Sequence, residues 1–156
     1  MRREIPPSLL RQIQDAWNYD MPALPEDWRT DPSEPGDLFR SFAGKTWDAV
    51  VSADFPDYFS ALTWLRSTCP AASVYYLASY LVAFFASRAH IGAHLLDQIE
   101  TFLLSLLESP EETLLSGAQI RAIECFLESV REDAYWTTYP NLIEKWKALE
   151  CRVDPN

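Results

Sequence analysis

The chain has 156 residues, the size of one ordinary domain, so we expect a single domain over 1–156. Apolar residues make up 48%, with eight Phe, seven Tyr and six Trp, which excludes a disordered acidic tail. The 23 acidic and 13 basic residues give a formal charge of −10. That charge argues against binding to nucleic-acid backbones and to anionic membranes, both of which require clustered cations.

The first helix is predicted over 8–17, where apolar residues recur at helical spacing. Residues 18–37 hold four prolines and six acids, which predicts an acidic, Pro-rich loop whose apolar residues pack on the domain. A short helix follows over 46–51, capped by a threonine. A further helix is expected over about 54–65, with an aspartate cap and a proline in its first turn.

The central helix is predicted over about 70–88, opening at Cys69-Pro70. It is apolar nearly all round, as expected of a helix surrounded by other helices. The charge-free stretch 67–87 also raises the possibility of a membrane span. Its tyrosines and serines favour a buried helix instead.

In the last third of the chain, Gly92 is expected to interrupt the pattern, so that a helix runs over 93–108. Ser116 and Gln119 match a capping box at the start of the next helix. The apolar face of that helix extends to Val130, and a last helix follows residue 140.

No segment alternates with a period of two between hairpin turns, and the whole chain has four glycines, which argues against a β-sandwich. The predicted fold class is therefore all-α. We expect a single compact bundle of six or seven helices around the buried central helix, with the Pro-rich acidic loop near the N-terminus.

The charge is unevenly distributed. Residues 15–57 hold ten acids and three bases (−7), residues 58–96 hold two bases and no acid (+2), and residues 97–133 hold nine acids and two bases (−7). One interpretation is a buried centre between solvated flanks. The alternative is that the acidic segments form a docking face for a basic partner.

A metal site would use His90 and His94, spaced i, i+4, with Asp97 one turn further, since two imidazoles and a carboxylate can hold zinc. The glutamate of the HExxH motif is absent, and Gly92 weakens the helix between the histidines. We therefore favour two histidines at a helix junction. A small metal-dependent hydrolase using these three residues stays an alternative function.

No other catalytic signature is present in the sequence. There is no GxSxG elbow, and Gly44-Lys45-Thr46 lacks the upstream glycine of a phosphate-binding P-loop. We expect no enzymatic activity and no cofactor.

The three cysteines, Cys69, Cys125 and Cys151, are odd in number and widely spaced, which is typical of reduced thiols in a cytoplasmic protein. The N-terminal residues lack the apolar run of a signal peptide. The expected location is the cytoplasm.

Acidic side chains beside aromatic residues favour a protein interface, where aromatic anchors supply affinity and charge supplies steering. We place this interface on the Pro-rich loop and on the acidic end of the long helix. The predicted partner-binding residues are Asp27, Trp28, Asp31, Glu34, Asp37, Glu108, Glu111 and Glu112.

The sequence thus predicts a non-enzymatic protein-protein interaction module with a basic protein partner. Its most concrete form is an immunity or antitoxin-like protein that neutralises a basic toxin or nuclease domain. Besides the hydrolase, a homodimeric structural or regulatory helical module stays an alternative.

Three segments also resemble a group of small bacterial all-helical proteins. They are FAGKTW at 42–47, YYLASYL at 75–81 and LSGAQIRAIECFL at 115–127. These match the F-x-G-K-x-W, YYL-x-x-Y and Q-x-x-A-I-x-x-F-L segments of that group, over roughly residues 39–130. The resemblance implies a bacterial source and a helical fold, and it carries no assigned activity. Ala78 stands where the group has proline, so this helix should be straighter here.

Overall fold

The computed structural model describes residues 4–32, 39–51, 61–87, 89–108, 115–131 and 141–153. Within them the chain is all-α, as predicted, and contains no strand. The elements are α1 (Pro7–Ala16), η1 (Glu26–Thr30), α3 (Trp47–Val51), α4 (Ala61–Thr68), α5 (Pro70–Ala86), α6 (Ala89–Leu107), α7 (Gly117–Arg131) and α8 (Leu142–Val153). Six of these helices have eight residues or more, in agreement with the predicted six or seven.

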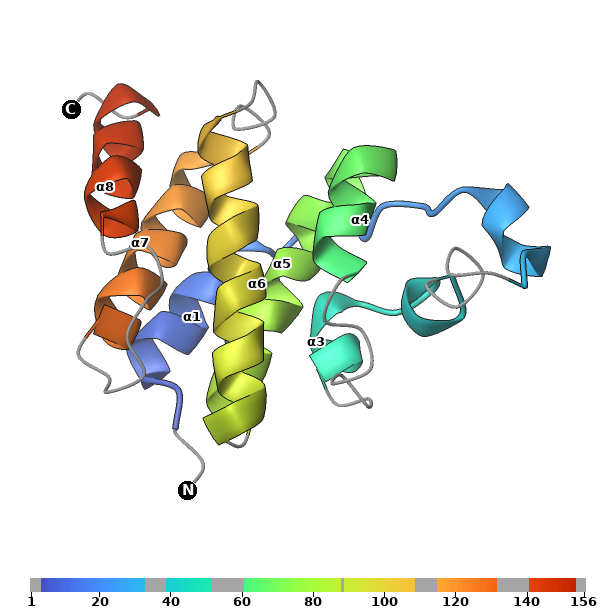
Figure 1. The fold of residues 1–156 in the computed structure, drawn as a ribbon, viewed down its shortest axis with the longest axis horizontal. Coiled ribbons are helices and arrows are strands. Elements are labelled where there is room, and N and C mark those ends of the chain that lie inside the picture. Colours follow the sequence, from blue (N-terminus) through green and yellow to red (C-terminus); the bar gives the residue numbers. More distant parts are fainter. Residues whose placement is uncertain are drawn as a thin grey trace.

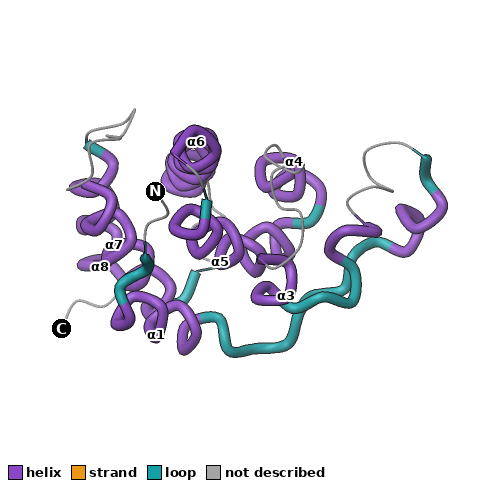
Figure 2. Tube along the Cα trace, turned by 90° about the horizontal axis from the view of Figure 1, so that it is seen from below, coloured by secondary structure: helices purple, strands orange, loops and turns teal. Residues whose placement is uncertain are grey.

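The central position of α5 is confirmed. This helix packs against α3, α4 and α6, while α7 packs against α1 and α8 (Figure 1). In the view of Figure 2, α5 lies between the α1, α7 and α8 group and the α3 and α4 pair. Thirteen of its 17 residues are buried, so the helix is enclosed on nearly every side.

Aromatic contacts join the two halves of the bundle. The Phe126 ring of α7 lies 5.6 Å from Phe84 and 5.8 Å from Phe85 of α5, both edge to face. Buried apolar side chains from α1 through α8 form one contiguous cluster. The described elements therefore share a single hydrophobic core.

The helix after α5 differs from the expectation. It was predicted to begin at Ala93, yet α6 runs without a break through Gly92. A glycine inside a helix costs about 1 kcal/mol relative to alanine. Gly92 is itself buried, and the side chains that follow it, such as Leu95 and Leu96, pack into the core. Tertiary burial outweighs the local propensity.

The predicted capping box is confirmed. The Ser116 backbone N–H donates to Gln119 Oε1 at 2.9 Å, and the Gln119 N–H donates to Ser116 Oγ at 3.1 Å. The pair satisfies two free donors in the first turn of α7. The predicted aspartate cap near residue 54 lies outside the described residues, and α4 is described from Ala61.

The loop over 18–37 contains an element that the sequence did not predict. Residues Glu26–Thr30 form the 3-10 helix η1, which follows Pro25. Figure 2 shows the chain running from α1 past α5 toward α3 and η1. The described part of the loop, residues 18–32, therefore packs on the molecule through Leu24 and Trp28.

Two tryptophan side chains lie at the two ends of the segment that joins α1 to α3. Trp17, at the end of α1, donates its indole N–H to the Val74 carbonyl of α5 at 2.9 Å. Trp47, at the start of α3, donates its indole N–H to the Trp17 carbonyl at 3.3 Å. Both rings are buried, so each N–H finds the partner that a buried indole requires.

Buried hydroxyl groups of α5 satisfy the backbone around Trp47. The Trp47 N–H donates to the Tyr75 hydroxyl at 3.2 Å, and Ser79 Oγ donates to the Trp47 carbonyl at 2.7 Å. Ser73, on the same helix, instead makes a local bond: its Oγ donates to the Pro70 carbonyl at 2.6 Å. The tyrosines and serines of α5 thus bind segments distant in the sequence as well as their own turn.

The Tyr76 hydroxyl serves the turn before α3. It lies 2.8 Å from the Phe42 carbonyl and 2.9 Å from the Lys45 carbonyl, and shares its proton between them. Gly44 in this turn has φ +73°, in the left-handed region that glycine adopts without strain. The glycine of the Gly-Lys-Thr segment therefore ends a helical turn.

Of the helices that the structure describes, none has both the length and the hydropathy needed to cross a bilayer. Cys69 and Cys125 are half-buried and are in the thiol form. The side chain of Cys151 lies outside the described residues.

Replacing Ser79 with alanine should lower the free energy of unfolding by about 1–2 kcal/mol, because a buried hydrogen bond to the Trp47 carbonyl is lost. Urea unfolding followed by circular dichroism measures the change. Ser73→Ala is the matched control on the same helix, with an expected loss below about 0.5 kcal/mol, since its bond is local and alanine favours helix. Equal losses in the two variants would contradict the role given to Ser79.

The buried tyrosines of α5 predict a loss of stability at high pH. Burial raises the pKa of Tyr80 above its ordinary value of about 10, whereas the unfolded chain ionises near that value. Above about pH 10 the unfolded state therefore binds fewer protons, and stability falls by up to about 1.4 kcal/mol per pH unit for this group. Unfolding free energies between pH 8 and 11.5 test this. Tyr80→Phe should show a shallower decline, and an unchanged slope would contradict it.

Candidate functional site

The structure places only part of the predicted partner-binding set. Asp27 is exposed in the first turn of η1, Asp31 is half-buried after it, and Glu108 is exposed after α6. Four residues lie outside the described residues: Glu34, Asp37, Glu111 and Glu112. The two predicted acidic groups are not brought together by any described contact, and their role in binding stays a prediction.

Trp28 has a packing role. Its side chain is 8% exposed, and its ring lies 4.8 Å from that of Trp64 on α4. The expectation of an exposed aromatic anchor on the loop therefore does not fit Trp28. The other residues of η1 are exposed, so Trp28 is the residue of η1 that packs against α4.

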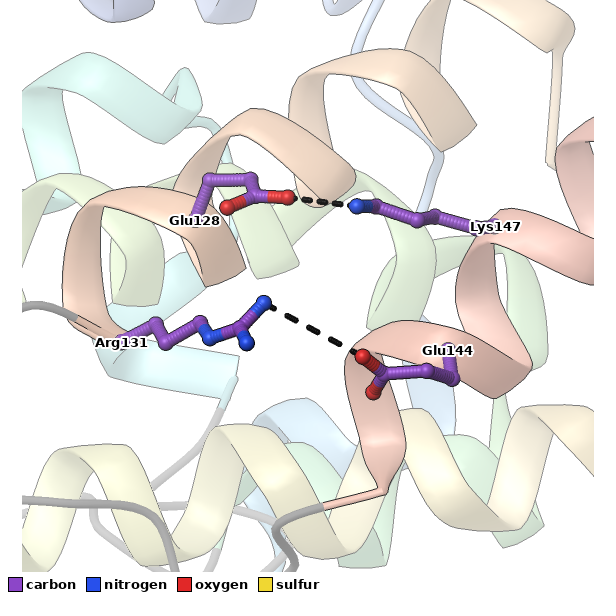
Figure 3. A network of polar contacts seen from close by, with 4 residues as sticks. All are labelled: Glu128, Arg131, Glu144 and Lys147. Carbon is purple, nitrogen blue, oxygen red and sulfur yellow. Dashed lines mark ion pairs between the residues drawn. The ribbon is translucent and has the colours of Figure 1, made fainter.

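One acid on α7 and one on α8 are paired within the chain. Lys147 Nζ of α8 lies 2.7 Å from Glu128 Oε1, and Arg131 Nη1 lies 4.0 Å from Glu144 Oε1 (Figure 3). The hydrogen bond from Lys147 lowers the pKa of Glu128, and the same contact raises the pKa of Lys147. Both pairs are exposed and contribute little stability, but they neutralise acidic side chains that a basic partner would otherwise meet.

The large exposed hydrophobic side chains of the described residues stand together. They are Tyr19, which is 47% exposed, and Met21, which is 38% exposed, and the exposed carboxylate of Asp20 lies between them in the sequence. We call Tyr19, Asp20, Met21 and Pro22 the Tyr19 surface. Single exposed apolar residues are ordinary, but tyrosine and methionine are both enriched at protein interfaces.

A cavity of about 380 Å³ opens beside the Tyr19 surface. Its lining comes from the end of α1, the loop after it and the first turns of α5 and α7. Its lining residues are Ala16, Tyr19, Asp20, Pro22, Ala71, Val74, Ser116 and Gln119. The volume is within the range of about 300–1,000 Å³ that is common for binding sites.

Tyr19 is held in place from two sides. Its ring contacts Tyr75 edge to face, with ring centroids 5.5 Å apart. Its hydroxyl accepts a hydrogen bond from Gln119 Nε2 at 3.2 Å, and Gln119 is only 3% exposed. Because the other amide atom of Gln119 belongs to the capping box, the start of α7 positions Tyr19.

Two carboxylates act on the same tyrosine of α5. Burial is the main cause that raises the pKa of Tyr75, and the negative charges of Asp48 and Asp20 raise it further. Asp48 is exposed in the first turn of α3, where a hydrogen bond with the Thr46 side chain lowers its pKa. The electrostatic environment at this edge of the cavity is therefore negative.

The residues that line the cavity are suited to binding a ligand. Burial raises the pKa of Tyr19 despite its hydrogen bond with Gln119, so the phenol stays protonated at neutral pH. A protonated phenol is a poor general base. The groups that line the cavity offer an exposed ring, a carboxylate and apolar walls, which suit a cationic or amphipathic ligand.

The predicted metal ligands are only partly described. His94 and Asp97 are exposed on α6, and the side chain of His90 lies outside the described residues. Within the described part of the chain, no group of three or more His, Cys, Asp or Glu side chains is placed to hold a metal ion. No described feature favours the metal-dependent hydrolase.

The Tyr19 surface was missed at the sequence level, although a signal for it exists. Tyr19 and Met21 follow the last turn of α1 and precede a proline, so neither belongs to a helical face. Apolar residues without a periodic partner are either loop anchors or exposed. Leu24 and Trp28 are anchors, whereas Tyr19 and Met21 are exposed.

No protein-family model, curated protein or solved structure gives a significant match to this chain. The comparisons therefore establish no family, and the assignment of function depends on the site itself.

Trp28→Ala should lower the free energy of unfolding by about 3 kcal/mol, because it removes a buried ring that contacts Trp64. Met21→Ala, in the same loop, should change it by less than about 0.5 kcal/mol, since Met21 is exposed. Urea unfolding of both variants measures the difference. A loss for Met21→Ala as large as that for Trp28→Ala would contradict this division of roles.

Proposed function

We propose that the protein is a non-enzymatic interaction module that binds a basic protein partner through the Tyr19 surface. The observation that carries the proposal is the exposure of Tyr19 and Met21 on either side of Asp20, together with the cavity that Tyr19 and Asp20 line. Tyrosine is enriched among residues that dominate binding energy, and methionine adapts to varied apolar partners.

The overall charge supports a basic partner. A formal charge of −10 speeds the encounter with a cationic protein and opposes association with a second copy of the same charge. Near the Tyr19 surface, Asp20 and Asp48 add a local negative field. Long-range charge would set the association rate, and the apolar contacts would set the dissociation rate.

The more specific form of the proposal is an immunity or antitoxin-like protein in the bacterial cytoplasm that neutralises a basic toxin or nuclease domain. An acidic surface with an exposed aromatic side chain can occupy a site that binds nucleic-acid phosphates and bases. The resemblance of the segments at 42–47, 75–81 and 115–127 to small bacterial helical proteins supports the bacterial origin.

A charge reversal at the Tyr19 surface should separate this site from the predicted acids of η1. Asp20→Lys should weaken partner binding at least tenfold, because it places a cation against a basic partner at the centre of the interface. Asp27→Lys is the matched control: it makes the same charge change at an exposed residue of η1, and should reduce affinity about two- to threefold through the overall field.

The measurement is affinity capture from the source cells with wild type and both variants, followed by mass spectrometry and titration of the captured protein. The proposal requires a basic protein that binds wild type and Asp27→Lys but is lost with Asp20→Lys. Capture that is unaffected by Asp20→Lys, or that depends equally on both positions, would count against the Tyr19 surface. Neutralisation of the captured protein's toxicity on co-expression tests the immunity form.

A further inference from the structure

We propose that the cavity beside the Tyr19 surface takes an arginine side chain of the basic partner, with the guanidinium group at Asp20 and the Tyr19 ring. This inference deepens the proposed function and depends on it for the source of the arginine. It follows from the division of the cavity lining into apolar and polar residues, from the charge of Asp20 and from the fixed position of the Tyr19 ring.

The lining divides into apolar walls and a polar rim. Ala16, Pro22, Ala71 and Val74 supply small apolar surfaces, to which a three-methylene stem can pack. Tyr19, Asp20, Ser116 and Gln119 supply the polar groups. An apolar stem with a charged planar head matches this division better than a wholly apolar or wholly polar ligand.

The charge of the lining selects a cation. Asp20 is the charged residue among the lining side chains, and it is acidic. The first turns of α5 and α7 also border the cavity, and the positive end of a helix favours an anion. Asp20 lines the same cavity and supplies such an anion. The guanidinium group would then pair with the Asp20 carboxylate.

The polar side chains of the lining favour a ligand that donates hydrogen bonds to Asp20. Gln119 uses its Oε1 in the capping box and its Nε2 on the Tyr19 hydroxyl. The bond from Gln119 occupies the acceptor position of the Tyr19 hydroxyl, which leaves the Asp20 carboxylate as the acceptor for a cation. Arginine is favoured over lysine because its planar fork bonds a carboxylate in a bidentate manner and stacks on an aromatic ring.

The test is a titration of the whole protein with N-acetyl-arginine amide, followed by ¹⁵N–¹H NMR. Saturable shift changes should centre on the amides of Tyr19, Asp20, Ala71 and Gln119. N-acetyl-citrulline amide, the neutral isostere, should bind at least tenfold more weakly, and N-acetyl-lysine amide several-fold more weakly. Equal binding of citrulline, no saturable change, or stronger binding of N-acetyl-aspartate amide would overturn the proposal.

Two variants locate the effect. Asp20→Asn should weaken binding of the arginine compound about tenfold, and Ala71→Phe should abolish it by filling the cavity from the exposed start of α5. Asp97→Asn, an exposed acid on α6, is the control and should leave binding unchanged. Circular dichroism checks that each variant folds. Asp20→Asn alone decides the matter if Ala71→Phe does not fold, and an unchanged affinity in Asp20→Asn would overturn the proposal.

The two proposals fail in different ways. If partner capture depends on Asp20 while the arginine compound does not bind, the arginine inference is wrong and the interaction function stands. If the arginine compound binds as expected but no basic protein depends on Asp20, the interaction function is wrong and the cavity is a guanidinium site of another origin.

Discussion

The hydroxyl groups of α5 provide the constraint on which the rest of the structure depends. A buried segment without regular structure must find partners for its backbone polar groups, or pay several kcal/mol for each. Tyr75, Tyr76 and Ser79 supply these partners from within the core. A helix of aliphatic residues at this position would bury the same area but would leave the backbone before and within α3 unsatisfied.

The candidate site follows from that constraint. The Trp17 indole N–H donates to α5, and the Trp47 indole N–H donates to the Trp17 carbonyl. Residues 18–22, which follow Trp17, therefore pass close to α5 and α7. Tyr19 then contacts Tyr75 and Gln119 while its ring remains half in solvent. The hydrogen-bond network thus fixes the position of an exposed aromatic side chain, and reduces the conformational entropy that Tyr19 would lose in a complex.

Helical periodicity was enough to predict the all-α class, the central helix and the apolar face of α7, because these depend on neighbours within a few turns. The capping box at Ser116 and Gln119 was also predictable, since its chemistry is local. The local pattern did not decide whether the side chains of Trp28 and Tyr19 are buried or exposed. Both are aromatic residues in a loop, and whether each is buried depends on a side chain of a distant helix, Trp64 in one case and Tyr75 in the other. The predicted helix break at Gly92 was wrong because it followed the low helix propensity of glycine, whereas burial keeps α6 continuous there.

The hydrogen bond between Gln119 and Tyr19 joins residues 100 positions apart. Closing so long a loop carries an entropic cost that local contacts do not, and native pairs of this separation tend to form late. The Tyr19 surface is therefore completed only when α7 has docked against α1. During synthesis, a chain that has not yet reached α7 would lack the bond that fixes Tyr19, so this surface takes its final geometry only after most of the protein has been made.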